Sequence, residues 1–169
     1  MTIAPSSHLR LALRDPASLI ATWFGLGMIP IAPGSWASLV ALPLAWVLRA
    51  GSGMAGLAVA IALTFGAGWW AAGSVARARG VPDPGEVVVD EIVGQWLVLL
   101  AAPFNPLAWI AGFLLFRLFD IWKPWPVRWA DRHVKGGLGI MLDDILAAGY
   151  ALLVLAAAAT IVGAWRVHG

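Results

Sequence analysis

The sequence predicts an all-α integral membrane protein, a helical bundle of about four to five helices in one domain spanning residues 1–169. Hydrophobic residues make up 61% of the chain, and its mean hydropathy is +0.84. Charged residues make up only 12%, about half of the roughly 25% found in soluble domains. The apolar residues also form long runs, and each membrane crossing takes roughly 20 residues. The chain therefore has room for a membrane-embedded bundle and for no separate soluble domain.

Four apolar stretches predict the helices, at residues 36–48, 54–76, 92–116 and 145–165. Residues 49–53 contain Gly-Ser-Gly and predict a turn between the first two stretches. Residues 102–106 read Ala-Pro-Phe-Asn-Pro, and the two prolines of this segment would break or kink a helix. If the third stretch folds back as a hairpin, arms of about 11 to 13 residues reach only about 16 to 20 Å, short of a roughly 30 Å apolar core. We therefore expect one or more hairpins that need not cross fully and are re-entrant or partly interfacial.

The basic residues favour a hairpin at 92–116 over a single crossing. With a hairpin, nine of the eleven Lys and Arg residues share one face and only Arg49 and Arg166 lie on the other. With a single crossing, the split becomes five against six, and the bias expected for cytoplasmic loops disappears. The hairpin also places the polar segments 25–38, 81–91 and 117–144 on one cytoplasmic face. The nine bases of that face are Arg10, Arg14, Arg77, Arg79, Arg117, Lys123, Arg128, Arg132 and Lys135.

The acidic residues are as unevenly distributed as the bases. Eight of the nine lie between residues 83 and 144, and an ionised carboxylate at membrane depth is costly unless it is paired or binds a cation. Two adjacent pairs, Asp90-Glu91 and Asp143-Asp144, each precede an apolar run, and Asp120 adds a fifth carboxylate. Oxygen ligands of this kind suit Mg²⁺. The alternatives are helix N-capping by the acidic pairs and a location in water-exposed loops.

Basic residues that could hold a phosphate lie close to these acids in the sequence. Arg117, Asp120 and Lys123 are spaced by three residues, so they share a helical face, where a plain salt-bridge row is the alternative interpretation. Trp122, Trp125 and Trp129 alternate with the bases and favour headgroup depth in a membrane. Glycines could let backbone amides approach an anion at Gly34-Ser35 and at residues 136–139. The candidate phosphate-binding residues are Lys123, Arg128, Arg132, Lys135, Gly34 and Ser35.

Several phosphatase chemistries are excluded by composition. The chain has no cysteine and therefore no thiol nucleophile, and it has no Asp-x-Asp motif. Its three histidines are His8, His133 and His168, two of them near the termini, which disfavours a two-histidine site. Carboxylates that hold a metal, beside cations that hold phosphate, remain as the route to phosphoryl transfer.

Three blocks of sequence resemble the phosphatidylglycerophosphatase A family of bacterial inner-membrane enzymes. They are GLGMIPIAPGSW at 25–36, DPGEVVVDEIVG at 83–94, and FRLFDIWKPWP at 116–126 continuing to GGLGIMLDD at 136–144. The resemblance covers most of the chain from 25 to 144, and the apolar stretches between the blocks match only in character. It implies Mg²⁺-dependent removal of the terminal phosphate of phosphatidylglycerophosphate on the cytoplasmic side. The implied partners are this lipid substrate and the bilayer, with no nucleic acid.

Carried onto this chain, the resemblance implies catalytic roles for Asp90, Glu91, Asp120, Lys123 and Asp144. The implied Mg²⁺ ligands come from Asp90, Glu91, Asp120, Asp143 and Asp144, and Lys123 is the nearest motif cation. Both water and an aspartate remain open as the nucleophile. Two other functions also remain open: a different Mg²⁺-dependent lipid phosphotransferase, whose acidic motif spacing is absent here, and a cation-binding transporter or scaffold.

Overall fold

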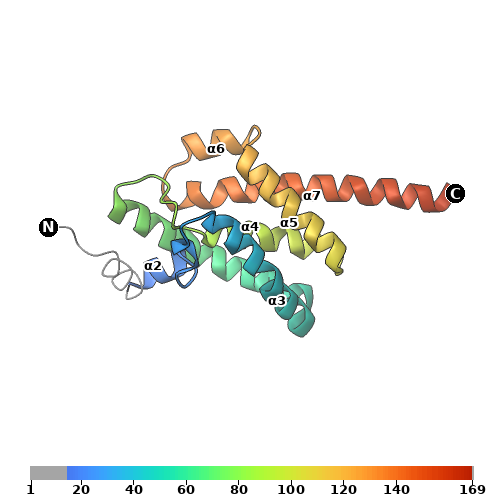
Figure 1. Cartoon of the computed structure of the whole chain (residues 1–169), viewed down its shortest axis with the longest axis horizontal. Helices are drawn as coiled ribbons and strands as arrows, with labels where there is room; N and C mark the ends of the chain where they lie inside the picture. Colours follow the sequence, from blue (N-terminus) through green and yellow to red (C-terminus); the bar gives the residue numbers. More distant parts are fainter. Residues whose placement is uncertain (1–14, 169) are drawn as a thin grey trace.

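The computed structural model describes residues 15–168, and their side chains as far as residue 160. Arg10 and Arg14 and the side chain of Arg166, which the charge count used, lie outside these described parts. Regular secondary structure within residues 15–168 is entirely helical (Figure 1). The elements in chain order are α2 (Pro16–Ala21), the 3-10 turn η1 (Leu26–Met28), α3 (Pro33–Arg79), α4 (Val89–Ala101), α5 (Pro106–Trp122), α6 (Val127–His133) and α7 (Gly136–His168).

Helix α3 is a helical hairpin, as the first two apolar stretches predicted. Gly53 lies at φ 68° and ψ −166°, which interrupts the helix and turns the chain. The two arms hold roughly 20 and 26 residues, or about 30 and 39 Å at 1.5 Å per residue. The first arm is longer than the predicted stretch at both ends. It begins at Pro33, which occupies the first helical turn, where proline costs no hydrogen bond. It also continues through residues 49–52, so the predicted turn at 49–53 is confined to Gly53. Both arms are thus long enough to cross an apolar core.

The second hairpin, formed by α4 and α5, confirms the break predicted within residues 92–116. The backbone leaves the helix at Ala102, and Asn105 starts α5 by accepting a 2.9 Å hydrogen bond from the Ala108 amide. The arms contain 13 and 17 residues, so α5 is longer than expected because it continues to Trp122. At this end of the bundle, Arg49 donates hydrogen bonds of 2.7 and 2.8 Å to the carbonyls of Leu99 and Ala102. One arginine therefore joins the turns of the two hairpins.

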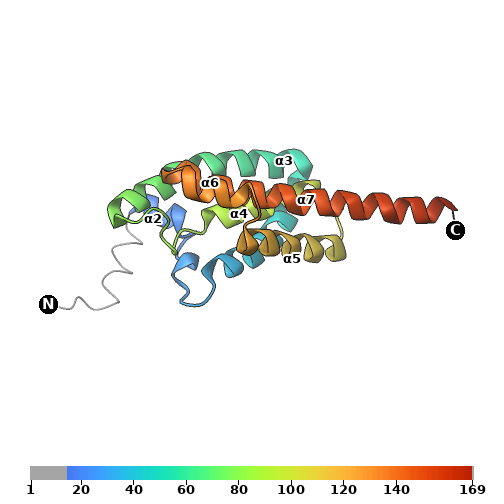
Figure 2. The same ribbon diagram turned by 90° about the horizontal axis from the view of Figure 1, so that it is seen from above.

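Helix α4 lies at the centre of the bundle and packs against α3, α5 and α7 (Figure 2). Small side chains line the facing arm of α3, where Ala37, Ala41 and Ala45 are fully buried. The Trp96 indole of α4 donates a 2.9 Å hydrogen bond to the Ala41 carbonyl. Close helix packing of this kind fixes where the first turn of α4 lies relative to α3 and α7.

Helix α7 begins at Gly136, nine residues before the predicted start at Ile145. Residues 136–139 form the first turn of α7, which crosses α3 there. A Cβ at Gly137 would overlap the Trp69 carbonyl oxygen and lie 2.6 Å from the Gly73 amide nitrogen. Gly137 therefore allows α7 and α3 to approach closely. The C-terminal part of α7 extends past the other helices (Figures 1 and 2).

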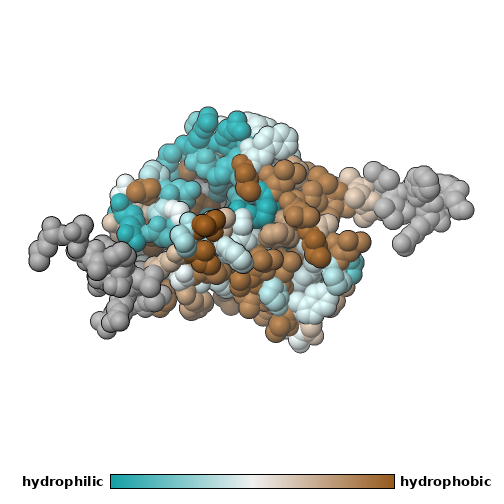
Figure 3. Space-filling view, in the orientation of Figure 1, coloured by the Kyte–Doolittle hydropathy of each residue, from teal (hydrophilic) through white to brown (hydrophobic). Residues whose placement is uncertain are grey.

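The outer surface of the bundle is compatible with a membrane. Two helical segments are long and apolar enough to cross one, Pro33–Arg79 and Gly136–Thr160. Large apolar side chains point outward, among them Val47, Leu63 and Leu107 at 70%, 69% and 79% exposure. Figure 3 shows hydrophilic side chains gathered over α6 and the neighbouring end of the bundle, hydrophobic ones over the middle and right of the view, and a few pale or hydrophilic ones at the lower right tip. The polar and apolar surfaces are thus segregated along the bundle.

Candidate active site

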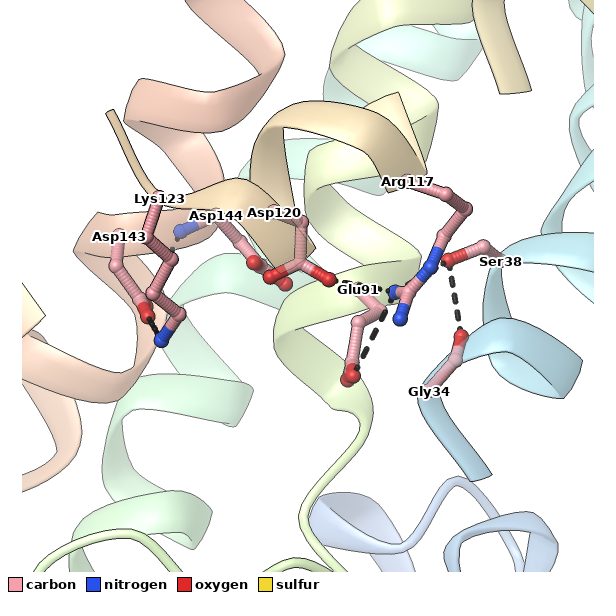
Figure 4. A network of polar contacts seen from close by, with 8 residues as sticks. All are labelled: Gly34, Ser38, Glu91, Arg117, Asp120, Lys123, Asp143 and Asp144. Carbon is pink, nitrogen blue, oxygen red and sulfur yellow. Dashed lines mark hydrogen bonds and ion pairs between the residues drawn. The ribbon is translucent and has the colours of Figure 1, made fainter. Parts of the chain in front are cut away.

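The three polar segments predicted to share a face do meet, at the end of the bundle where α3, α4 and α7 begin and α5 ends (Figure 4). Arg117 near the end of α5 donates a 3.2 Å hydrogen bond to Ser38 Oγ in the second turn of α3. Its Nη1 also lies 3.8 Å from a carboxylate oxygen of Glu91 in the first turn of α4. Lys123, just after α5, lies 2.6 Å from Asp143 in α7. Four helices therefore contribute to one polar cluster.

Three carboxylates of this cluster are close enough to share a cation. Asp90, Glu91 and Asp144 each offer an oxygen, and these three oxygens lie within 4.8 Å of one another. The residues are deeply placed: Asp90 is 8% exposed and Asp144 is 3% exposed. Three carboxylates at this spacing in a buried place repel one another unless a cation or protons neutralise them.

One oxygen of each carboxylate is buried and has no hydrogen-bond partner. These atoms are Asp90 Oδ1, Glu91 Oε2 and Asp144 Oδ2. An unpaired buried polar atom is costly, and most such atoms in proteins contact a water, an ion or a ligand. A hard divalent cation takes carboxylate oxygens as ligands. The residues present therefore fit a Mg²⁺ ion.

Neither acidic pair serves as a helix cap, so the N-capping alternative is not supported. Asp90 and Glu91 lie in the first turn of α4, but the N-cap residue is Val88 and no side chain caps that helix. Asp143 and Asp144 lie about two turns inside α7, because that helix begins at Gly136. The position of Asp144 beside α4 results from helix packing, not from capping.

Gly34 forms one wall of the cluster. A Cβ at this position would overlap Oε1 of Glu91, so the first turn of α3 lies directly against the carboxylate. The glycine sits in the helix, where it costs roughly 0.5 to 1 kcal/mol relative to alanine. The close approach of α3 to Glu91 requires a residue without a side chain here.

Arg117 is the cation closest to the three carboxylates in the described structure. Its side chain is 14% exposed, and Nη1 lies 2.8 Å from Asp120 Oδ2 as well as near Glu91 and Ser38. Ser38 in turn donates a 2.9 Å hydrogen bond to the Gly34 carbonyl. The Nε atom of Arg117 is buried and has no partner. A guanidinium has five N–H donors in a planar fork, so this side chain retains donors for an anion.

Lys123 is held by two carboxylates. Its ammonium lies 2.7 Å from Asp131 and 2.6 Å from Asp143. Burial alone would lower the pKa of Lys123, but the charge of Asp143 and hydrogen bonds to both carboxylates outweigh it and raise the pKa above its ordinary value. Lys123 is therefore a cation at physiological pH, with most of its hydrogen-bonding capacity directed to these acids.

The family model described as phosphatidylglycerophosphatase A matches residues 19–159. The chain belongs to the phosphatidylglycerophosphatase A family. The chain is therefore a phosphatase by family, and the resemblance of the three sequence blocks is confirmed.

Relatives in this family cover most of the chain. A phosphatidylglycerophosphatase A from Escherichia coli (strain K12) is 42% identical over 159 residues, covering 87% of this chain and 88% of the relative. One from Haemophilus influenzae is 42% identical over 147 residues, covering 86% and 90%. A Bacteroides thetaiotaomicron protein with the provisional name phosphatidylinositol-3-phosphatase is also 42% identical, over 153 residues, covering 86% and 94%. No solved structure matches the chain.

In this member of the phosphatidylglycerophosphatase A family, the five predicted metal-binding acids fall into two groups. Asp90, Glu91 and Asp144 form the buried group of three. Asp120 is paired with Arg117, and Asp143 is paired with Lys123. Metal binding by all five stays a prediction, and the geometry favours the first three.

The predicted phosphate-binding residues lie in three places. Gly34 and Ser35 are in the first turn of α3 beside Glu91. Lys135 lines a small cavity of about 30 Å³ with Asp83 and Asp143. Arg128 and Arg132 line a larger cavity of about 520 Å³ with Lys123. We call the larger one the basic cavity; its other lining residues are Trp122, Pro124, Trp125, Trp129 and His133.

Three polar residues of the cluster were missed as functional candidates from sequence. Arg117 looked like one member of a surface salt-bridge row, and its burial becomes visible only when α3 packs over it. Ser38 lies in an apolar run and gave no signal. Gln95 is fully buried in α4, one turn after Glu91, and both its amide oxygen and nitrogen lack partners. A glutamine inside an otherwise apolar stretch was the one available signal for it.

Proposed function

We propose that this chain hydrolyses the terminal phosphate monoester of phosphatidylglycerophosphate, giving phosphatidylglycerol and inorganic phosphate, and that the reaction depends on Mg²⁺. The observation that carries the proposal is the group of Asp90, Glu91 and Asp144, in which each carboxylate has one unpartnered oxygen and Glu91 lies beside Arg117. Membership of the family supports the same reaction, because two relatives carry the name phosphatidylglycerophosphatase A.

The group of three carboxylates is where Mg²⁺ would be held. Bound there, the ion would supply a Lewis acid that stabilises charge on the phosphoryl oxygens. Asp120 lies next to this group through its pair with Arg117 and would keep the guanidinium oriented.

Arg117 is the residue we assign to the terminal phosphate. Its Nε lacks a partner, and its planar donors match a phosphate better than an ammonium does. Phosphoryl transfer depends mainly on positioning and on neutralising charge that spreads over the equatorial oxygens. Lys123 would act through Asp143, since two carboxylates already occupy its ammonium. It is therefore proposed as a positioning residue.

We further propose that the site faces the cytoplasm at a bacterial inner membrane. Arg77, Arg79, Arg128, Arg132 and Lys135 lie at the end of the bundle that holds the acids, whereas Arg49 lies at the opposite end. An excess of bases marks cytoplasmic segments. The single domain over residues 1–169 would then place its site at headgroup depth.

Phosphate release from purified protein in detergent tests the proposal. Phosphatidylglycerophosphate is supplied with Mg²⁺ or with a chelator, and phosphatidylinositol 3-phosphate serves as a second substrate because of the third relative's name. We expect release from phosphatidylglycerophosphate only with Mg²⁺. Loss of the lipid's terminal phosphate only when an acceptor is present, with the phosphate found on the acceptor and not as inorganic phosphate, would indicate a phosphotransferase. No loss of phosphate from either lipid would support a transporter or scaffold.

A further inference from the structure

We propose that the basic cavity binds the phosphodiester of a phospholipid headgroup, through Arg128 and Arg132, at a subsite separate from the buried carboxylates. The inference rests on the proposed function and deepens it. Phosphatidylglycerophosphate, the proposed substrate, carries two phosphates: the terminal monoester to be removed and the diester that joins the headgroup to the glyceride. The cluster around Arg117 can bind the terminal monoester, so the diester needs cations elsewhere.

The basic cavity has the size and charge for this role. Its volume of about 520 Å³ lies within the roughly 300 to 1,000 Å³ typical of ligand sites. Lys123, Arg128, Arg132 and His133 line it, and none of its lining residues is acidic. An anion entering the cavity would therefore meet the two arginines of α6 and no carboxylate of the lining.

The two arginines have donors to offer. Across residues 15–160, neither Arg128 nor Arg132 forms an ion pair. The contact found for Arg128 is a 3.2 Å hydrogen bond from Nη2 to the Trp122 carbonyl, which fixes the side chain beside the cavity. The two residues are four apart on α6, so they lie on one face of that helix. Paired guanidinium groups suit phosphate oxygens.

The aromatic lining indicates that the anion belongs to a lipid. Trp122, Trp125 and Trp129 are 60%, 77% and 50% exposed, and exposed indoles favour the membrane interface. Trp129 also stacks on His133, with ring centroids 5.2 Å apart. Indoles beside the arginines would contact the apolar part of a lipid while the guanidinium groups hold its phosphate.

Lys123 places this cavity next to the carboxylate cluster. It lines the cavity, while its ammonium lies 2.6 Å from Asp143, the neighbour of Asp144 in the chain. A headgroup bound in the cavity would extend past Lys123 toward the buried acids. Anchoring the diester in this way would position the monoester for removal.

Binding of short-chain lipids without a terminal phosphate tests the inference. The probe is dioctanoyl-phosphatidylglycerol, titrated by calorimetry into the full chain in a neutral detergent. Glycerophosphoglycerol, which has the same diester but no acyl chains, and inorganic phosphate are the other two probes. The variants are Arg128→Gln/Arg132→Gln and a matched control, Arg77→Gln/Arg79→Gln, which removes the same charge from the same end of the bundle.

We expect the lipid to bind wild type and the control pair within about twofold of each other, and to bind Arg128→Gln/Arg132→Gln about tenfold or more weakly. Asp144→Asn should leave lipid binding unchanged. Equal binding by wild type and the cavity variant, an equal loss in the control pair, or no binding by wild type overturns the inference. Inorganic phosphate or glycerophosphoglycerol binding as tightly as the lipid overturns the lipid assignment. Because the binding measurement needs no turnover, it can contradict the proposed subsite while phosphate release is still observed. Phosphate release can likewise be absent while the lipid binds.

Discussion

The Arg117 guanidinium lies 2.8 Å from the Asp120 carboxylate, one turn apart on α5. On an exposed helix, such a pair contributes only about 0.2 to 0.5 kcal/mol. Here Arg117 and Asp120 are 14% and 13% exposed, and Ser38 and Glu91 contact the same guanidinium nitrogen. The pair therefore links α5 to α3 and α4, and a change in its geometry should affect the site.

Arg117→Lys tests the planar fork, because the substitution keeps the charge and removes the bidentate geometry. We expect phosphate release to fall by about 10- to 100-fold, since lysine cannot span Asp120, Ser38 and a phosphate together. Steady-state kinetics measure the change, with Arg77→Lys as the control at an exposed arginine. Activity near wild type in Arg117→Lys would show that only the charge matters.

Asp144→Asn and Asp120→Asn test the carboxylates themselves. Each variant should lose phosphate release by at least about 100-fold, because removing a charge from a metal or phosphate site costs several kcal/mol. Glu86→Gln is the matched control, since Glu86 pairs with Arg79 outside the cluster. Normal activity in both aspartate variants, with insertion into the membrane unchanged, would contradict the assignment.

Gly34→Ala tests the contact between α3 and Glu91. The added methyl group would overlap Oε1 of Glu91, so the carboxylate must move and we expect activity to fall by roughly tenfold or more. Gly149→Ala in α7 adds the same methyl group where nothing lies within 4 Å. Equal activity in the two alanine variants would mean that the cluster tolerates displacement of Glu91.

The sequence predicted the hairpins and the meeting of the polar segments because both depend on where charges and prolines fall along the chain. The distribution of Lys and Arg correctly predicted the break within residues 92–116. It could not predict that residues 136–139 are helical, because the close approach of Gly137 to Trp69 and Gly73 is made with another helix. The role of Arg117 also depends on a tertiary contact, with Ser38 of α3, which has no local signal. Which ends of the helices meet could thus be predicted, whereas the individual side-chain contacts between helices could not.

Mg²⁺ should stabilise the folded protein by binding the group of three carboxylates. A ligand present at about 100 times its Kd adds roughly 2.7 kcal/mol to the free energy of unfolding. We expect the thermal midpoint in detergent to rise with Mg²⁺ for wild type and to rise much less for Asp90→Asn. Ca²⁺ serves as a comparison, and K⁺ at equal ionic strength controls for screening. An equal rise in wild type and Asp90→Asn would place the ion elsewhere.

Lys123→Gln should destabilise the fold, because it leaves Asp131 and Asp143 without their shared cation. Breaking a buried pair by removing one partner costs about 3 to 5 kcal/mol, and the Asp143 side chain is 9% exposed whereas Asp131 is 32% exposed. We therefore expect the lower end of that range, measured as a fall in thermal midpoint.

The pKa of Lys123 is raised in the folded protein. Its stabilising contribution is therefore complete below the ordinary lysine pKa and is lost only as the pH rises through the raised pKa. The loss in Lys123→Gln should thus not diminish as the pH rises to about 9. Asp143→Asn in the same chain should recover part of the stability, and a double variant no more stable than Lys123→Gln would show that Asp143 does not depend on this ammonium.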